Sequence, residues 1–134
     1  MMKTLTVKTS LREEFIDITD EVENVVKNSG VKNGICYLYV PHTTAGITIN
    51  EGADISVKKD IITALKKIAP YGAEYLHMEG NADSHIKTTL VGSSVSVFIE
   101  EEKLILGQWQ SIFFCEFDGP RARKIYLKII KEEA

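Results

Sequence analysis

The sequence predicts an α+β domain in which a mixed or mainly antiparallel sheet is covered by two or three helices. Segments with strand-like alternation outnumber segments with helical periodicity. Four strand-like segments in the second half are separated only by short polar stretches, which is typical of hairpins. No repeat, low-complexity tract or linker interrupts the 134 residues. Residues 1–134 are therefore expected to form a single compact domain.

The first third of the chain is expected to contain two strands and a helix. Residues 4–9 and 14–19 alternate apolar and polar side chains, which predicts two strands joined by a short turn. Thr19 is the expected N-cap of the helix that follows, because acidic residues fill the next positions and valines recur at helical spacing. Gly30 is expected to end this helix.

The middle of the chain has the clearest periodicity. Residues 34–40 are apolar almost throughout, which predicts a strand buried on both faces, and residues 46–50 form a shorter alternating strand. A helix is predicted from about residue 54 to 68, with an apolar stripe on one side and lysines on the other. Pro70 prevents its continuation.

A short third helix is predicted over residues 84–91, with Asp83 as its N-cap and Gly92 as its terminator. Two adjacent threonines weaken its helical pattern. The strands expected after it span 94–100, 103–106, 110–117 and 124–130.

Composition excludes several classes of protein. A net charge of −3 argues against a nucleic-acid-binding protein, which needs a basic surface. The longest apolar run, residues 35–40, is too short to cross a membrane, and the first residues lack the apolar block of a signal peptide. We therefore expect a cytoplasmic protein in which Cys36 and Cys115 are reduced and buried, with no nucleic-acid or membrane partner.

All three histidines lie in polar, glycine-bearing segments. His42 opens "HTTAG", and His77 and His85 enclose "HMEGNADSH". In one straight strand the latter two would lie roughly 26 Å apart, but Gly80 and Asn81 favour a sharp reversal that would bring them together. Three histidines around one open position are typical of catalytic zinc. The residues alone leave a second interpretation open, in which each histidine bonds its own loop.

Other polar residues also have two interpretations. Glu116 continues the apolar side of strand 110–117, so we expect a carboxylate at a strand end near a cleft. Asn50 and Glu51 either belong to the turn before a helix or contribute to a site. Trp109 either packs in the core or stacks against a planar ring.

Three long motifs resemble the YjbQ-like family, also called the secondary thiamine-phosphate synthase family. They are "PHTTAGITINEGAD", "YLHMEGNADSHIKTTLVGSSV" and "LGQWQSIFFCEFDGPRARKI", and the resemblance extends from about residue 15 to 130. It implies a compact α+β fold and a homotrimer with its cleft near the subunit interfaces. It also implies synthesis of thiamine phosphate from a hydroxymethylpyrimidine diphosphate and a thiazole phosphate, so the expected partner is a small phosphorylated metabolite.

The resemblance also implies a set of site residues. It makes His42, His77 and His85 the metal ligands. The residues expected around them are Asn50, Glu51, Asn81, Asp83, Gln110, Glu116 and Arg121. For such chemistry we expect Glu116, Asp83 and Arg121 to act in catalysis. Phosphate contacts are expected from Arg121, Lys87, Thr43 and Thr44, and ring contacts from Trp109 and Gln110.

The metal is expected to be zinc, because imidazole suits zinc better than magnesium, although a diphosphate substrate would call for magnesium. This mismatch leaves two alternatives to the synthase. One is a metal-dependent hydrolase of a small metabolite, and the other is a non-enzymatic trimer that binds a metal or an anion.

Overall fold

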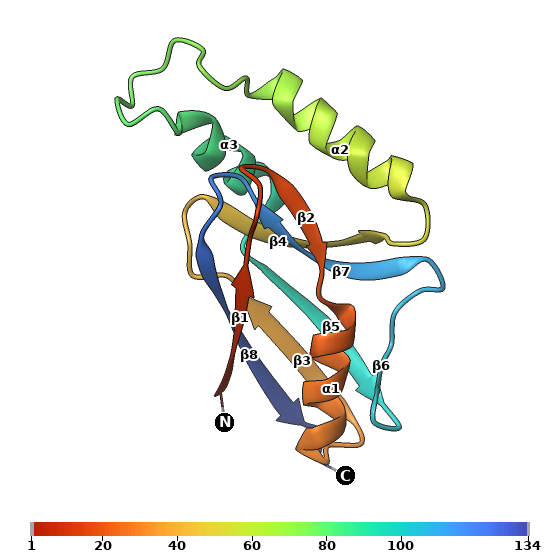
Figure 1. Cartoon of the computed structure of the whole chain (residues 1–134). Helices are drawn as coiled ribbons and strands as arrows, with labels where there is room; N and C mark the ends of the chain where they lie inside the picture. The colour runs from red at the N-terminus through yellow and green to blue at the C-terminus, as the bar shows by residue number, and fades with distance from the viewer. Residues whose placement is uncertain (1, 134) are drawn as a thin grey trace.

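The computed structural model describes residues 2–133 (Figure 1). Its elements, in chain order, are β1 (Met2–Lys8), β2 (Glu14–Asp17), α1 (Thr19–Ser29), β3 (Gly34–Tyr39), β4 (Ala45–Glu51), α2 (Ile55–Ile68), α3 (Ala82–Val91), β5 (Ser94–Glu100), β6 (Lys103–Leu104), β7 (Gln110–Glu116) and β8 (Ala122–Lys131). Over these residues no helix combines the length and apolarity needed to cross a membrane.

The strands form two sheets, and the predicted α+β domain is confirmed. One sheet has five strands in the order β1-β8-β3-β5-β6, and the other has three in the order β2-β7-β4. Every strand pair in the described part of the chain is antiparallel. The prediction of a mainly antiparallel sheet is therefore correct, but the strands divide between two sheets.

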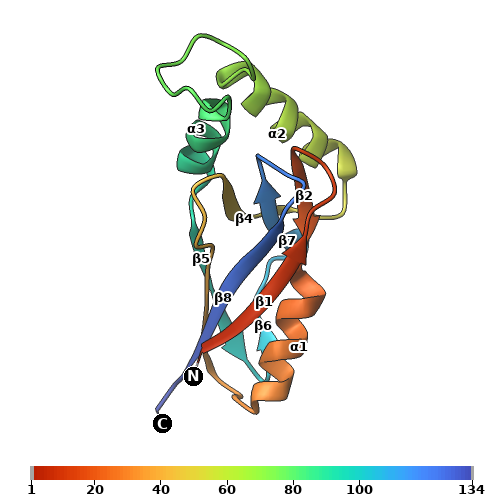
Figure 2. The same ribbon diagram turned by 60° about the vertical axis from the view of Figure 1, so that its left-hand side comes forward.

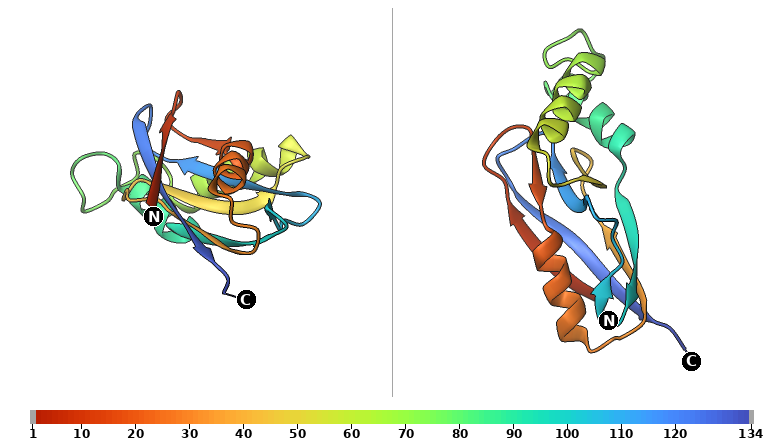
Figure 3. Two further views of the ribbon diagram at one scale, coloured as in Figure 1. Left: turned by 90° about the horizontal axis from the view of Figure 1, so that it is seen from below. Right: turned by 90° about the vertical axis from the view of Figure 1, so that its right-hand side faces the viewer.

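The elements stack in three layers, as the two views in Figure 3 show. The five-stranded sheet packs against the three-stranded sheet and α1, and the main apolar core lies between them. The opposite face of the three-stranded sheet packs against α2 through a second, smaller core. Phe15, Leu65, Phe113, Cys115 and Phe117 form that second core.

Strand β7 belongs to both cores, which explains its apolar sequence. Ile112 and Phe114 point into the main core, whereas Phe113 and Cys115 point towards α2. A strand that is covered on both faces needs apolar side chains at successive positions. Glu116 continues the Ile112 side and therefore lies between the two sheets, where a charged group needs partners.

The outer face of the five-stranded sheet carries no helix within residues 2–133 (Figure 2). Tyr37 and Tyr39 on β3, Phe98 on β5 and Ile130 on β8 expose about half or more of their surface there. A free surface of this kind is unusual for a monomer.

The helix starts differ from the predictions. Thr19 is the first residue of α1 and makes no cap bond with its side chain; instead, the Asp17 carboxylate accepts its backbone N–H at 2.9 Å. Asp83 lies inside α3, which begins at Ala82 after Asn81. The side chains of both expected caps bond other partners: the Thr19 hydroxyl donates to Asp17, and the Asp83 carboxylate accepts from Arg12. Asp54 does cap α2, where it accepts the N–H of Ser56 at 3.0 Å.

The two cysteines are free and buried, as predicted. Cys36 lies in the main core and Cys115 in the second core. Burial raises the pKa of Cys36 to about 12 and raises that of Cys115 well above its ordinary value. Both are therefore unreactive thiols at neutral pH.

Candidate functional site

His77 and His85 meet at one end of the molecule. His85 lies in the first turns of α3, and His77 lies in the loop between α2 and α3. Their ring centres are 5.1 Å apart and the rings meet edge to face. The chain reversal predicted around Gly80 is confirmed, because Gly80 has a φ of 84°. Two of the three histidines thus come together within one chain.

His42 shares a pocket with His85. The pocket has a volume of about 410 Å³. It is lined by Tyr39, Val40, His42, Thr43, His85, Thr88, Thr89, Gly92 and Ser93. These residues come from the end of β3, the loop after it, one face of α3 and the turn after α3. Thr88 is 8% exposed, and its hydroxyl has no hydrogen-bond partner among residues 2–133.

His42 is held by the backbone of β8. Its Nε2 accepts the N–H of Lys124 at 3.0 Å. Burial lowers the pKa of His42, and the positive charge of Arg123 acts in the same direction. The imidazole is therefore neutral at pH 7, with its free nitrogen, Nδ1, carrying the proton.

A buried ion pair lies beneath the His42 loop. Glu116 and Arg123 are both buried, and the Arg123 guanidinium donates to both carboxylate oxygens. The Thr9 hydroxyl also donates to Glu116, at 2.8 Å, as do the backbone N–H groups of Phe117 and Asp118. Burial acts to raise the pKa of Glu116, but the Arg123 bond and the other donors outweigh it and hold that pKa below its ordinary value.

This ion pair positions the loop that carries His42. Arg123 donates to the hydroxyl of Thr44 at 2.9 Å, and the carbonyl of Thr44 accepts the N–H of Phe117 at 3.1 Å. Thr44 is therefore a buried structural residue. Glu116 does not reach a cleft as the sequence predicted, because it is fully enclosed and its oxygens are already bonded. Its placement supports a positioning role more than a catalytic one.

The opposite face of α3 carries a second charged cluster. Lys87 is completely buried and pairs with Glu13 at 2.7 Å and Asp83 at 2.8 Å. Arg12 forms two bonds to the Asp83 carboxylate. Burial acts to raise the pKa of Asp83, but the bonds from Arg12 and Lys87 hold it below its ordinary value. Asp83 and Lys87 therefore anchor α3, and neither has a free group for the expected catalysis or phosphate binding.

Asn81 and Arg121 meet at Asp118. The Asn81 amide donates to the Asp118 carboxylate at 2.9 Å, and the exposed guanidinium of Arg121 donates to the same oxygen at 3.0 Å. The Asn81 side-chain oxygen is buried and accepts no hydrogen bond from the part of the chain that the structure describes. Both residues lie near the start of α3, but the guanidinium of Arg121 is already paired with the Asp118 carboxylate.

The remaining predicted residues lie at the other end of β4 and β7. Ala45 pairs with Glu116 near the histidines, whereas Glu51 pairs with Gln110, six residues further along, which is about 20 Å. Glu51 accepts the N–H groups of Ala53 and Asp54, so the helix-start interpretation is correct for it. Asn50 bonds the N–H of Glu51 in the same turn. Within one chain this end cannot join the histidine site.

Trp109 belongs to this distant end as well. It is 59% exposed, so the expectation that it packs in the core is wrong. It lies in the turn before β7, and Gln110 beside it accepts the N–H of Gly107 at 2.7 Å.

A three-histidine metal centre is not assembled in this structure. Among residues 2–133, no group of three or more His, Cys, Asp or Glu side chains is placed to hold a metal ion. His42 differs from the other two because its acceptor nitrogen is already bonded to Lys124. The pair of His77 and His85 is the part of the predicted metal set that the fold brings into contact.

Two residues of the site were missed in the sequence. Arg123 has the same strand parity as the buried Ile125 and Leu127, and this period-two pattern could have revealed it. Thr88 follows His85 by three positions on a helix, which places both on one face. Because Arg123 lies in a basic stretch, it was interpreted with its neighbours as part of an exposed face, and its period-two match to the buried residues was overlooked.

The fold and the histidine-bearing end define a small α+β domain with a polar pocket between a strand end and a helix. The model of the family described as "UPF0047 protein YjbQ-like" matches residues 3–132, and the chain belongs to this family. A UPF0047 protein of Methanocaldococcus jannaschii is 54% identical over 95% of this chain and 92% of its own. The UPF0047 protein YugU of Bacillus subtilis is 51% identical over 97% and 99%.

Solved structures agree with this assignment. A family member from Clostridium acetobutylicum is 52% identical, with a TM-score of 0.93 over 96% of this chain and 99% of its own. A protein from Sulfolobus solfataricus, described as YbjQ-like and of unknown function, is 38% identical, with a TM-score of 0.93 over 98% and 97%.

The expectation of thiamine-phosphate synthesis is wrong. The relatives are named only by their family, and the Sulfolobus protein is described as having an unknown function. The structure gives a physical reason as well. Lys87 and Arg121 are paired with carboxylates instead of forming a diphosphate clamp, and Trp109 lies far from the histidines. The names give no support to the hydrolase alternative either.

Proposed function

We propose that this protein binds a divalent transition metal ion, preferably zinc, through His77 and His85 and holds a small anionic metabolite beside it. The observation that carries the proposal is the 5.1 Å separation of the two imidazole rings. Two imidazoles that share a tetrahedral zinc at a Zn–N distance of about 2.0 Å have ring centres about 5 Å apart. The separation of the two rings is therefore that of a pair of imidazoles that share one ion.

The surroundings of the pair support an open, exchangeable site. His77 is exposed, and His85 lines the 410 Å³ pocket, so each of the two imidazoles borders space that solvent or a ligand can enter. Two protein ligands are fewer than the three of ordinary catalytic zinc sites, so the ion is expected to be held weakly. Water and an oxygen of the metabolite would complete its coordination. A bound zinc ion would supply positive charge for an anionic ligand.

Zinc titration calorimetry tests the metal site. His77→Ala and His85→Ala should each weaken zinc binding by more than about 100-fold, because even residues that only orient metal ligands contribute 10–100-fold. Glu79→Ala, in the same exposed loop as His77, is the matched control and should bind zinc like the wild type. Equal zinc affinity in wild type and His77→Ala would refute the proposal.

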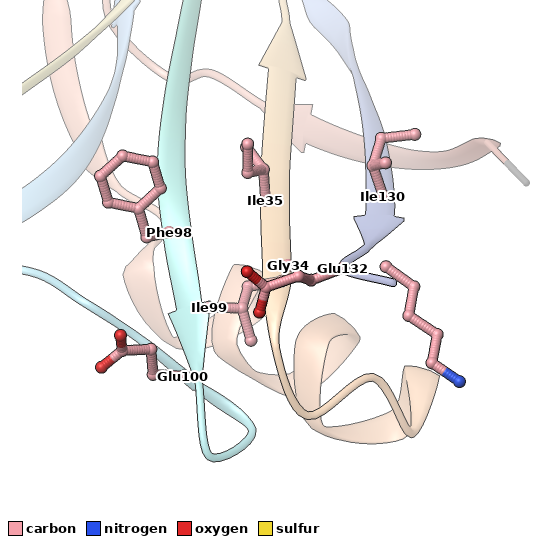
Figure 4. Close-up of a pocket in the computed structure, with 8 residues that line it drawn as sticks. Gly34, Ile35, Phe98, Ile99, Glu100, Ile130 and Glu132 are labelled. Atoms are coloured by element: carbon pink, nitrogen blue, oxygen red, sulfur yellow. The ribbon is translucent and has the colours of Figure 1, made fainter. Parts of the chain in front are cut away.

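We further propose that the protein forms a homotrimer through the outer face of its five-stranded sheet. Ile35, Phe98 and Ile130 line a hollow on that face (Figure 4). Tyr39 lies on the same strand as Ile35 and also lines the histidine pocket. A second copy on this face would remove apolar surface from water and would adjoin the site.

The mass in solution tests this assembly. One chain has a mass of 15.0 kDa, so a trimer has 3 × 15.0 = 45 kDa. Phe98→Asp should shift light scattering at micromolar concentration from the trimer to the monomer mass. Ile68→Asp is the control, because Ile68 is equally exposed but lies at the end of α2. A wild type that scatters as a monomer would refute the trimer.

We also propose that the protein is cytoplasmic. The two buried, unpaired cysteines support this location, because an oxidising compartment favours disulfide-bonded domains.

A further inference from the structure

We infer that the pocket beside His85 is an oxyanion site, in which the Thr88 hydroxyl and the Nδ1–H group of His42 donate hydrogen bonds to a phosphate or carboxylate group of the ligand. The inference rests on the proposed function for the presence of an anionic ligand. It gives His42 a role different from metal ligation, which the sequence had predicted.

Thr88 is the first part of the argument. The residue lines the pocket, and its buried hydroxyl has no hydrogen-bond partner among residues 2–133. A helical threonine ordinarily satisfies its hydroxyl on the carbonyl four residues earlier. The adjacent Thr89 does this, donating to the carbonyl of His85 at 2.9 Å. Thr88 instead keeps a buried donor free, and buried polar groups in native proteins nearly always have a partner.

His42 provides the second donor. A neutral imidazole has one acceptor nitrogen and one N–H group. The acceptor, Nε2, is occupied by the N–H of Lys124 at 3.0 Å, so the proton lies on Nδ1. A nitrogen that carries a proton cannot ligate a metal, but it can donate to a ligand in the pocket that His42 lines.

The chemistry of the walls identifies the class of ligand. The polar side chains around the pocket are hydroxyls from Tyr39, Thr43 and Ser93 and the two imidazoles, together with the threonines of α3. Among the residues that line the pocket, none is an aspartate or a glutamate, so no wall repels an anion. A group with several acceptor oxygens and no donor of its own satisfies such walls best. Phosphate and carboxylate share this property.

The test uses metal-free protein titrated with inorganic phosphate and, separately, with acetate. Thr88→Val keeps the shape of the side chain and removes its donor, so phosphate binding should weaken roughly ten-fold. Thr63→Val, on an exposed position of α2, is the matched control and should bind like the wild type. Tighter binding of phosphate than acetate would indicate a phosphate ester, and the reverse order a carboxylic acid. Equal phosphate affinity in wild type and Thr88→Val would overturn the inference.

Two substitutions of His42 test its role. In His42→Asn the amide nitrogen takes about the place of Nδ1, whereas in His42→Gln it extends towards the place of Nε2. Phosphate binding should therefore survive better in the asparagine variant, and the opposite order would overturn the assignment. Nitrogen chemical shifts of wild-type His42 should show the proton on Nδ1.

Zinc titration of the wild type separates this inference from the proposed function. A wild type that binds phosphate but takes up no zinc in the zinc titration would overturn the metal site and leave the pocket. A protein that binds zinc but neither anion would overturn the pocket and leave the metal site.

Discussion

The Glu116–Arg123 cluster and the cluster around the histidines lie next to each other in the structure. They differ in how many of their polar groups are hydrogen-bonded within the protein. In the Glu116–Arg123 cluster, both carboxylate oxygens and the guanidinium have partners inside the protein. In the histidine cluster, the Thr88 hydroxyl has no partner within the described residues, and His77 is exposed. A buried group without a partner costs free energy that a ligand can recover. A cluster whose polar groups are all hydrogen-bonded holds the fold together, whereas a cluster with unbonded polar groups can bind a ligand. The residue types alone do not make this distinction.

The largest expected effect comes from breaking the bonded cluster. Arg123→Met leaves Glu116 as an uncompensated buried charge, so the free energy of unfolding should fall by about 3–5 kcal/mol. Urea denaturation at pH 7 measures it. Arg121→Met is the control: its ion pair with Asp118 is exposed, and it should cost less than about 1 kcal/mol. Equal losses in the two variants would show that the buried Glu116–Arg123 pair stabilises the fold no more than an exposed ion pair does.

Acid should weaken the bonded cluster next. The folded-state pKa of Glu116 lies below its unfolded value of about 4.3, so its stabilisation is complete above that value and is lost as the pH falls through the folded pKa. Over that window one proton changes stability by at most about 1.4 kcal/mol per pH unit. Glu116→Gln should flatten this acid limb in denaturation series from pH 6 to 2. An unchanged slope would show that Glu116 does not titrate with unfolding.

The smallest effect should have the opposite sign. Thr88→Val replaces a buried, unbonded hydroxyl with a methyl group, so the free energy of unfolding should rise by about 1 kcal/mol. Thr9→Val should instead lose about 1–3 kcal/mol, because the Thr9 hydroxyl bonds Glu116 and Arg121. Thermal denaturation of the ligand-free variants measures both. A loss of stability in Thr88→Val would mean that its hydroxyl has a partner after all.

Most secondary structure could be predicted because it depends on local periodicity. The apolar stripe and Pro70 defined α2, and the continuous apolar run of β7 reflects its place between two cores. The placement of Glu116 on the Ile112 side was also readable. Other predictions failed. The strand at 34–40 is buried on one face only, because Tyr37 and Tyr39 are exposed on the other. Asp83 does not cap α3, because it bonds Arg12, a residue 71 positions away.

The site could be predicted only in part, because its bonds join distant segments. The histidine loops were recognisable by their glycines and polar residues, and the contact of His77 with His85 followed from the reversal between them. Which nitrogen of His42 remains free depends on Lys124, 82 residues away. No pattern in one stretch of sequence carries that information. The separation of Trp109 from the histidines likewise follows from strand register.

The placement of one cysteine in each core provides a natural pair of reporters for cooperativity. Cys36 is sealed between the two sheets, and Cys115 between the three-stranded sheet and α2. A thiol-specific reagent can modify each only when its own layer opens. Mass spectrometry of labelled peptides during mild denaturation would then give the labelling rate of each cysteine, and so the order in which the two cores open. Simultaneous labelling would mean that the layers unfold as one unit, whereas early labelling of Cys115 would mean that α2 detaches first.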